Sequence, residues 1–272
     1  MTQPPEPARL EKTIVVTGAS SGIGAAFARL AGARGARLVL AARREAELAE
    51  VARQAGHDAI AVVADVTLRE HVARILATAL AGFGHVDVWI NNAGRGISRP
   101  VAELTDDDFD DMMRVNVKSA LYGMQTVLPH FQSRGRGHIV NVSSMLGRVP
   151  MATQRSSYSA AKHALNALTA SLRIDLCQAY PDIHVSTVSP GVVATEFGVN
   201  ARGGGVDSRR IPGAQSAEEV AQVLLDVVRH PRADVYTRPG MRESVARYFA
   251  AEDMAEVEAT FKSLVPTGGS QP

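Results

Sequence analysis

The stretch Lys12-Thr13-Ile14-Val15-Val16-Thr17-Gly18-Ala19-Ser20-Ser21-Gly22-Ile23-Gly24 decides the fold of this chain. Its first half is rich in β-branched residues, which suit a buried parallel strand. The glycines let backbone approach a diphosphate closely, and the apolar-rich run 25–33 predicts a helix with free N–H groups at its start. The spacing is Gly-x-x-x-Gly-x-Gly rather than the Gly-x-Gly-x-x-Gly of the standard dinucleotide fingerprint. We therefore predict a strand, a glycine turn and a helix that bind the phosphates of a nucleotide.

Strands and helices alternate along the rest of the chain. The predicted strands are 12–17, 36–41, 58–64, 86–91, 137–142, 183–189 and 233–236. The predicted helices are 25–33, 45–54, 68–81, 106–132 with Thr105 as N-cap, 156–179, one from 220 onward, 243–249 and 254–264. This alternation predicts an α/β protein, a single doubly wound (Rossmann) domain with a mostly parallel sheet of about seven strands flanked by helices.

Length and charge narrow the class of protein. At 272 residues the chain can form one sizeable domain, which we place at residues 11–265. We expect residues 1–10, with three prolines, and 266–272 to be flexible tails. A net charge of +1 gives no electrostatic reason to expect nucleic acid or a membrane surface as partner. No run of 18 or more apolar residues is present, so we predict a soluble, cytoplasmic protein.

Cysteine and histidine give no sign of a metal site. Cys177 is the only cysteine, which excludes an intramolecular disulfide and a cysteine-based metal cluster. The eight histidines show no paired ligand spacing, so we predict no metal.

Tyr158 and Lys162 lie four residues apart in the stretch Ser157-Tyr158-Ser159-Ala160-Ala161-Lys162. On a helix this spacing puts the phenol and the ammonium on one face. A cation beside a tyrosine favours the phenolate and brings the group toward acid/base chemistry. Such pairs are also common by chance on solvated helices, so the pair gains meaning only from the motifs around it.

Several further motifs stand in a recognisable order. They are the glycine turn from Gly18 to Gly24, Asn91-Asn92-Ala93-Gly94, Asn116, Ser144, Tyr158, Lys162 and Pro190-Gly191. In this order and approximate spacing the chain resembles the classical short-chain dehydrogenases/reductases, over roughly residues 12–195. Each motif alone is common, but together they are very specific. The resemblance implies a Rossmann-type fold, a nicotinamide cofactor and hydride transfer to or from a carbonyl or alcohol carbon.

The resemblance also implies four catalytic residues. Tyr158 would donate a proton to the substrate carbonyl oxygen, and Ser144 would hydrogen-bond the same oxygen. Lys162 would hold the nicotinamide ribose and favour the tyrosinate. The backbone carbonyl of Asn116 would hold a water of the proton relay, with a simple side-chain-bonded asparagine as the alternative at this position.

Two neighbouring residues are candidates for the catalytic serine. The family pattern Ser-Ser-x-x-Gly, closing here at Gly147, favours Ser144 over Ser143. Ser144 stands fourteen residues before Tyr158, one more than the resemblance leads us to expect. An insertion within 148–155 would absorb the extra residue, and Ser143 remains the lesser candidate.

The end of the second predicted strand indicates which nicotinamide cofactor is bound. Rossmann proteins that bind NAD usually place an acid there to hold the ribose 2′-hydroxyl. Here the strand ends Leu40-Ala41-Ala42-Arg43-Arg44, without a carboxylate. An arginine suits a 2′-phosphate, so we predict NADP(H) rather than NAD(H), bound by Arg43 with Arg44 as a second candidate. The alternative is two exposed arginines at the start of a helix.

The resemblance extends the cofactor site along the chain. Asp65-Val66 matches a position beside the adenine ring, with an ordinary turn aspartate as an equal alternative. Thr195 would contact the carboxamide or a phosphate, unless it is only a helix N-cap. The full predicted cofactor set is Gly18, Ser20, Ser21, Gly22, Ile23, Gly24, Arg43, Asp65, Val66, Asn92, Ala93, Gly94, Tyr158, Lys162, Pro190, Gly191, Val193 and Thr195.

The substrate side is poorly defined by sequence. Segment 198–213 holds Gly203-Gly204-Gly205 and falls where the family has a mobile substrate lid, although a surface loop fits its composition equally. Arg202, Arg209 and Arg210 would favour an acidic substrate if they were not simply solvated. The substrate itself is predicted only as a small-molecule carbonyl or alcohol.

Assembly and function follow as two further expectations. Family members usually pair through two long helices, here 106–132 and 156–179, so we predict a homodimer or homotetramer. The apolar face of the second helix, Ala161, Ala164, Leu165, Leu168, Leu172 and Leu176, serves either this pairing or the monomer core. The predicted function is an NADP(H)-dependent oxidoreductase, and the alternative is a cofactor-binding sensor or scaffold without turnover.

Overall fold

The structure, a computed structural model, describes residues 9–261. Seven strands form one sheet in the order β3-β2-β1-β4-β5-β6-β7, and every neighbouring pair is parallel. The strands are β1 Thr13–Thr17, β2 Arg37–Ala42, β3 Ala59–Val63, β4 Val88–Asn91, β5 Gly137–Val142, β6 Ile183–Ser189 and β7 Asp234–Tyr236. The predicted doubly wound α/β fold is confirmed, with a sheet that is wholly rather than mostly parallel.

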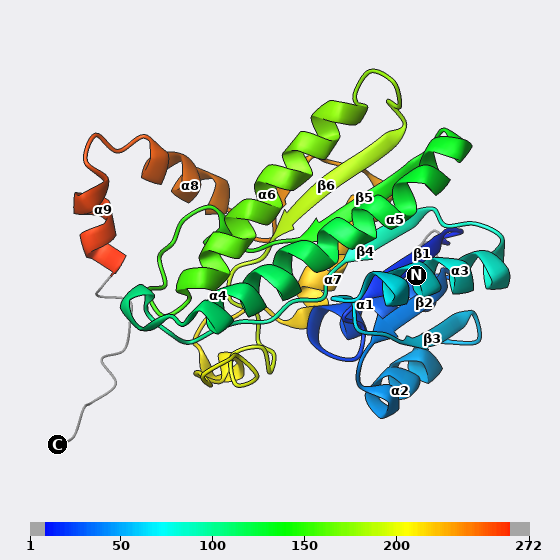
Figure 1. Cartoon of the computed structure of the whole chain (residues 1–272), viewed down its shortest axis with the longest axis horizontal. Helices are drawn as coiled ribbons and strands as arrows, with labels where there is room; N and C mark the ends of the chain where they lie inside the picture. The colour runs from blue at the N-terminus through cyan, green and yellow to red at the C-terminus, as the bar shows by residue number, and fades with distance from the viewer. Residues whose placement is uncertain (1–8, 262–272) are drawn as a thin grey trace, which may run out of the picture.

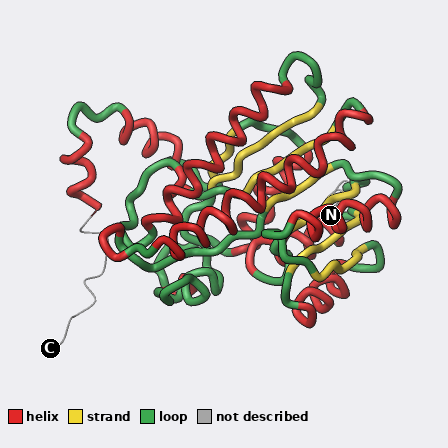
Figure 2. Tube along the Cα trace, viewed as in Figure 1, coloured by secondary structure: helices red, strands yellow, loops and turns green. Residues whose placement is uncertain are grey.

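Helices cover both faces of the sheet, which lies between them in Figure 1 and Figure 2. They are α1 Gly22–Gly32, α2 Glu45–Ala55, α3 Arg69–Phe83, α4 Asp106–Met113, α5 Ser119–Arg134, α6 Ser156–Leu176, α7 Ala217–Arg229, α8 Met241–Phe249 and α9 Met254–Phe261. One apolar cluster joins α1, α2 and α7 to Ile14 and Val16, and a second joins α3, α5 and α6 to Val15 and Trp89. Successive residues of β1 therefore enter opposite cores, which is why the strand is apolar throughout its centre.

The buried Trp89 and Asn91 mark the centre of the sheet. The indole Nε1 of Trp89 donates to Oδ1 of Asn91 at 2.8 Å, and Nδ2 of Asn91 donates to Oδ1 of Asn141 at 2.8 Å. Strand order reverses between β1 and β4, so a crevice forms outside the carboxyl ends of these strands. The predicted site residues lie at this edge.

The predicted single helix 106–132 is wrong, because a π-helical turn, η2 Arg114–Lys118, separates α4 from α5. Within η2, Nδ2 of Asn116 donates to the carbonyl of Met112 at 3.1 Å, the carbonyl that a regular helix would pair with the Asn116 N–H. The expected N-cap of α4 is confirmed. The Thr105 hydroxyl accepts from the N–H of Asp108, whose carboxylate accepts from the N–H of Thr105.

The ordered domain begins earlier than predicted. Leu10, which we placed in a flexible tail, is 3% exposed and packs in the apolar cluster of α1, because its backbone N–H donates to the carbonyl of Arg34 at 2.7 Å. The remaining tail residues 1–8 and 266–272, and residues 262–264 of the last predicted helix, lie outside the described residues. Among residues 9–261, no helix combines the length and apolar character that crossing a bilayer requires.

Candidate active site

The turn after β1 packs backbone against backbone on the turn after β4. Gly18 has a φ of +67°, and a Cβ there would lie 2.8 Å from the Cα of Ala93. A Cβ on Gly24 would lie 2.5 Å from the Gly18 carbonyl oxygen and 2.7 Å from Nδ2 of Asn92. Any side chain at either glycine would push the turns apart. The structure thus brings four predicted residues together at the reversal of strand order.

Asn92 holds these turns by hydrogen bonds. Its Nδ2 donates to the carbonyls of Thr17 at 3.0 Å and Gly18 at 3.2 Å. The Thr17 hydroxyl in turn accepts from the N–H groups of Asn92 at 3.1 Å and Ala93 at 3.2 Å. The side-chain amide of Asn92 is therefore used to hold the two turns together.

The start of α1 faces the segment 190–195. Gly22 has a φ of +54°, and a Cβ there would lie 3.3 Å from Cγ2 of Thr195. The N-cap Ser21 makes no side-chain cap bond, and the first turn of α1 holds no acid. The N–H groups at the start of α1 are therefore available to an anion, and Gly22 has no side chain to block it. This arrangement fits the diphosphate of a dinucleotide.

Tyr158, Lys162 and Ser144 form a buried polar group beyond the end of β5. Their exposed fractions are 7%, 3% and 7%, and the Ser144 side chain hydrogen-bonds the phenol. The ammonium of Lys162 lies 5.7 Å from the centre of the Tyr158 ring and donates to the carbonyl of Val142 at 2.9 Å. The spacing on α6 therefore brings the phenol and the ammonium together as predicted.

Burial dominates the acidity of this group. It raises the pKa of Tyr158 to about 12, against the opposing effects of the Ser144 hydrogen bond and the Arg155 charge. It also lowers the pKa of Lys162 to about 8. The charge of Arg155 favours the phenolate but does not outweigh burial. The expected effect of Lys162 on the phenol stays a prediction.

The two serines that end β5 differ in their surroundings. The hydroxyl of Ser144 also accepts from the N–H of Leu146 at 3.1 Å, within the 3₁₀ turn η3, Met145–Gly147. The hydroxyl of Ser143 is buried with no hydrogen-bond partner in the described structure. Ser144 is therefore the serine whose side chain hydrogen-bonds Tyr158.

Asn116 pins the loop after β4 beside Lys162. Its Nδ2 donates to the carbonyl of Arg95 at 2.9 Å, and its Oδ1 accepts from the Arg95 N–H at 3.1 Å. A Cβ on Gly94 would lie 3.0 Å from Oδ1 of Asn116 and 3.7 Å from Nζ of Lys162. The side chain is thus fully engaged with backbone, as the alternative for this residue foresaw, and the water-holding role of its carbonyl stays a prediction.

Residues 12–203 match the protein family described as short chain dehydrogenase. This chain belongs to the short-chain dehydrogenase family. It is 38% identical over 185 residues to an uncharacterised oxidoreductase of Staphylococcus epidermidis, which covers 68% of this chain and 79% of that protein. A short-chain dehydrogenase/reductase of Burkholderia phymatum in complex with NAD superposes with a TM-score of 0.80 at 28% identity, covering 92% and 95% of the two chains. An alcohol dehydrogenase of Thermococcus sibiricus complexed with 5-hydroxy-NADP gives 0.73 at 27% identity, covering 84% and 96%.

At the end of β2, Arg44 rather than Arg43 contacts the glycine turn. Nε and Nη2 of Arg44 donate to the Ser20 hydroxyl at 3.3 and 3.2 Å, and its Nη1 lies 3.4 Å from a carboxylate oxygen of Glu47. Arg43 is exposed and acts on Asp65. Burial tends to raise the pKa of Asp65, but hydrogen bonds from Thr67 and the Arg43 charge lower it overall.

Three other predicted cofactor residues have mainly local roles. Asp65 accepts from the N–H and the hydroxyl of Thr67 at 2.9 and 2.8 Å, which is the turn geometry given as its alternative. Ile23 and Val66 are half-buried and pack on the two apolar clusters.

The C-terminal part of the chain reaches the site, which the motifs did not indicate. The N–H of Met145 donates to the carbonyl of Pro190 at 2.7 Å. A Cβ on Gly191 would lie 2.5 Å from Cε of Met241, the first residue of α8. Val193 pairs by a single bridge with Gln215. The predicted segment 190–195 is therefore enclosed by residues that sequence reasoning left without a role.

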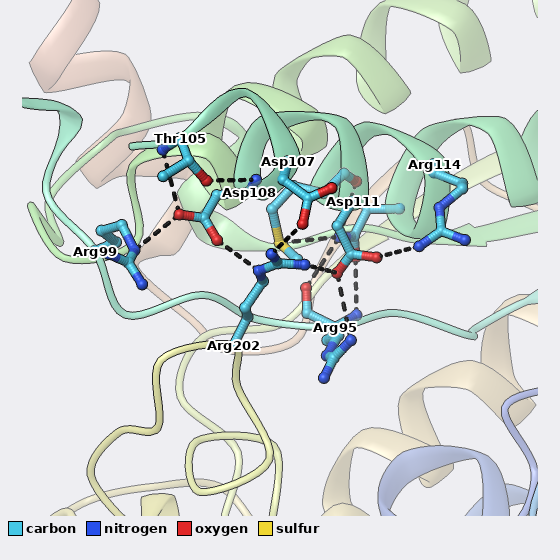
Figure 3. Close-up of polar contacts among 10 residues, drawn as sticks. Arg95, Arg99, Thr105, Asp107, Asp108, Asp111, Arg114 and Arg202 are labelled. Carbon is cyan, nitrogen blue, oxygen red and sulfur yellow. Dashed lines mark hydrogen bonds and ion pairs between the residues drawn. The ribbon is translucent and has the colours of Figure 1, made fainter. Parts of the chain in front are cut away.

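A cluster of acids and arginines holds the loop 198–213 onto the domain (Figure 3). Asp108 and Asp111 of α4 are 1% and 4% exposed. Arg202 binds Asp108 at 2.5 Å and Asp107 at 2.7 Å, and Arg99 binds Asp108 at 2.8 Å. Backbone bonds join the same parts, since the Arg202 N–H donates to Gly96 and its carbonyl accepts from Ser98.

This cluster corrects the expectation for the loop arginines. Arg202 is bound to acids of α4, and Arg209 is bound to Asp207 at 2.9 Å and to Glu196 at 3.4 Å. The guanidinium of Arg202 is therefore committed to α4, whereas the Arg209 side chain remains 51% exposed at the surface. The acids that neutralise Arg202 stand more than ninety residues earlier, so no local pattern reveals the pairing.

Proposed function

We propose that this protein is an NADP(H)-dependent oxidoreductase that transfers a hydride between the nicotinamide and a carbonyl or secondary alcohol carbon of a small molecule. The observation that carries the proposal is the buried Tyr158, hydrogen-bonded by Ser144 and accompanied by Lys162, at the same sheet edge as the glycine cradle. Membership of the short-chain dehydrogenase family supports the reaction class.

The residues of the chain divide the proton chemistry among them. When bound, the nicotinamide supplies or accepts the hydride. In reduction Tyr158 gives its phenolic proton to the substrate oxygen, and in oxidation the phenolate takes the proton back. Ser144 stabilises the charge on the same oxygen by a hydrogen bond. Lys162, whose Nζ would lie 3.7 Å from a Cβ on Gly94, holds ribose hydroxyls and resupplies the proton in this proposal.

The NADP(H) preference rests on charge at the end of β2. Arg44 lies on Ser20 of the glycine turn, and Arg43 follows the strand directly. A 2′-phosphate in this place would meet two guanidinium groups and a hydroxyl, whereas the carboxylate that suits a free 2′-hydroxyl is absent from the strand end 40–44. One solved relative holds NAD and another holds an NADP derivative, so the relatives do not decide between the two cofactors. The proposed preference for NADP(H) therefore rests on these local charges.

A homodimer or homotetramer is part of the proposal. On the apolar face of α6, Ala161, Leu165 and Leu176 are buried within the monomer, whereas Ala164, Leu168 and Leu172 are only partly buried. The monomer core therefore accounts for part of this face, and the proposed assembly rests on family resemblance. Light scattering that gives a monomer near 28.9 kDa would contradict it.

Turnover with a panel of carbonyls and alcohols, for wild type and Tyr158→Phe, tests the proposed function. We expect Tyr158→Phe to lose about 10²–10⁴-fold in rate, since it removes only the proton transfer. Its affinity for NADPH should stay unchanged. Equal activity of the two proteins, or NADPH binding without any turnover by wild type, would instead favour a cofactor-binding sensor.

A further inference from the structure

The chain on either side of Ser144 is held by two side chains of α6. Before the serine, Nζ of Lys162 donates to the carbonyl of Val142 at 2.9 Å. After the serine, Nδ2 of Asn166 donates to the carbonyl of Gly147 at 2.7 Å. Lys162 and Asn166 are four residues apart, so they project from successive turns on one face of the helix. The segment that carries Ser144 is therefore bracketed by α6.

The contact between Asn166 and Gly147 is buried and closely packed. Asn166 is 6% exposed, and Gly147 is buried at the end of η3. A Cβ on Gly147 would lie 2.8 Å from Nδ2 of Asn166 and 2.9 Å from the carbonyl carbon of Lys162. The 3₁₀ turn therefore rests directly on the backbone of α6. The amide of Asn166 fixes it there by a hydrogen bond that burial protects from competition with water.

Hydrogen bonds within η3 connect this anchor to the serine hydroxyl. The N–H of Gly147 donates to the carbonyl of Ser144 at 2.9 Å, and the N–H of Leu146 donates to the Ser144 hydroxyl oxygen at 3.1 Å. The same hydroxyl hydrogen-bonds the phenol of Tyr158. One connected set of bonds thus runs from Asn166 through the turn to Tyr158, and both of its ends lie on α6.

The two side chains that bracket Ser144 differ in what else they do. In the proposed function Lys162 also holds ribose hydroxyls and resupplies a proton, so its ammonium has other partners during turnover. Asn166 is neutral and lies one helical turn further from Tyr158, with its amide nitrogen bound to Gly147. A hydroxyl stabilises charge on a substrate oxygen most effectively when it is already held in place. Asn166 supplies a support of this kind.

We propose that Asn166 is a positioning residue, which fixes the Ser144 hydroxyl against Tyr158 through the carbonyl of Gly147. The role rests on the proposed function, in which this hydroxyl stabilises charge on the substrate oxygen. Because Asn166 acts through Ser144 and not on the cofactor, its loss should lower kcat while NADPH affinity stays at the wild-type value.

A double-mutant cycle with Ser144→Ala tests this role. Asn166→Leu removes the amide and keeps a similar volume, and Asn166→Ala replaces it if leucine prevents folding. Thr169→Val is the matched control, because Thr169 is a buried residue of the same helix whose hydroxyl accepts from Asn141 of β5 at 2.9 Å and makes no bond to η3. Carbonyl reduction with NADPH is measured for each variant with and without the Ser144 hydroxyl.

We expect Asn166→Leu to lower kcat about 10- to 100-fold when Ser144 is present, because the hydroxyl is no longer held in place. In the Ser144→Ala background it should change kcat by less than about twofold, since no hydroxyl is left to position. Thr169→Val should leave kcat near its starting value in both backgrounds. Equal losses from Asn166→Leu in the two backgrounds would overturn the proposal, because they would show a structural effect that does not pass through the serine.

Hydrogen exchange gives a readout that needs no turnover. The N–H groups of Leu146, Gly147 and Arg148 are bonded within the turn. They should exchange about tenfold faster in Asn166→Leu than in wild type or Thr169→Val, as expected for the loss of one hydrogen bond that holds the turn. Faster exchange in a protein that reduces no carbonyl would refute the proposed function and leave Asn166 as the anchor of η3. An active enzyme whose kcat and exchange both ignore Asn166→Leu would refute the role of Asn166 and leave the proposed function standing.

Discussion

The cofactor side of this site and the loop 198–213 are held by different kinds of contact. The cofactor side is backbone packed on backbone, with Gly18 and Gly24 so close to their neighbours that no side chain fits. The loop is held by buried charges, because Asp108 and Asp111 bind its Arg202. The first depends on a spacing within a few residues, and the second depends on pairs that meet only after folding.

The largest contrast should come from the serines. Ser144→Ala should cost about 2.7–4 kcal/mol of transition-state stabilisation, because it removes a hydrogen bond to the reacting oxygen. Ser143→Ala is the neighbouring control and should cost little, since its hydroxyl has no partner in the described structure. Steady-state kcat/KM of both variants measures the difference. A larger loss at Ser143 would show that the assignment is off by one residue.

Lys162→Met should change the pH dependence of folding stability and, separately, weaken cofactor binding. Burial lowers the folded-state pKa of Lys162 from 10.5 to about 8, so the unfolded chain binds this proton more tightly. Wild-type stability should therefore rise from about pH 8 toward 10, by up to about 3 kcal/mol. The raised pKa of Tyr158 acts in the opposite direction above about pH 10.

Urea unfolding at stepped pH tests this prediction. In Lys162→Met the rise should vanish and the protein should be more stable at neutral pH, although cofactor binding weakens. The same pH dependence in both proteins would mean that Lys162 is not buried as described.

A smaller effect is expected at the cofactor side. Arg44→Ala should weaken NADPH binding by about ten- to a hundredfold, which corresponds to one charge-assisted hydrogen bond. NADH affinity should not change, and Arg43→Ala should have the weaker effect of the two. Fluorescence titration with each reduced cofactor gives both ratios. If neither variant alters the NADPH/NADH ratio, the preference for the phosphorylated cofactor is wrong.

The smallest effect concerns motion of the loop 198–213. Asp108→Asn should speed hydrogen exchange in residues 198–210, because it weakens the ion pairs that hold Arg202 and Arg99. Asp107→Asn is the control, since its carboxylate is 85% exposed and such pairs contribute little.

Acid should loosen the same loop. Burial tends to raise the pKa of Asp108, but its hydrogen bonds with Thr105 and Arg202 lower it overall. A lowered folded-state pKa means that the stabilisation is present at neutral pH and is lost as pH falls below about 3.8. Exchange in the loop that is equal at neutral and acidic pH would contradict this.

Sequence reasoning succeeded where the chemistry is local. The strand, glycine turn and helix from 12 to 33 and the Tyr158–Lys162 spacing could be read directly, because each depends on neighbours within one turn or one strand. The same reasoning drew one helix from 106 to 132 through Asn116, where the structure has a π-helical turn. The side-chain bond of Asn116 to the Arg95 carbonyl, from another segment, lay beyond any local pattern.

Sequence reasoning failed for the arginine of the loop 198–213 for a physical reason. The sequence does not show whether an arginine will pair with an acid in the folded chain. Arg202 was therefore considered as a binder of an acidic substrate, although Asp108 of α4 forms an ion pair with it.

Trp89 gives this protein an optical probe that needs no labelling. It is the only tryptophan, it is fully buried in β4, and its indole is hydrogen-bonded to Asn91 at the end of the strand beside the cofactor crevice. Emission excited at the indole therefore reports one place, the centre of the sheet. A shift to longer wavelength will follow the opening of that centre, and energy transfer to a reduced nicotinamide will follow its arrival at the neighbouring crevice.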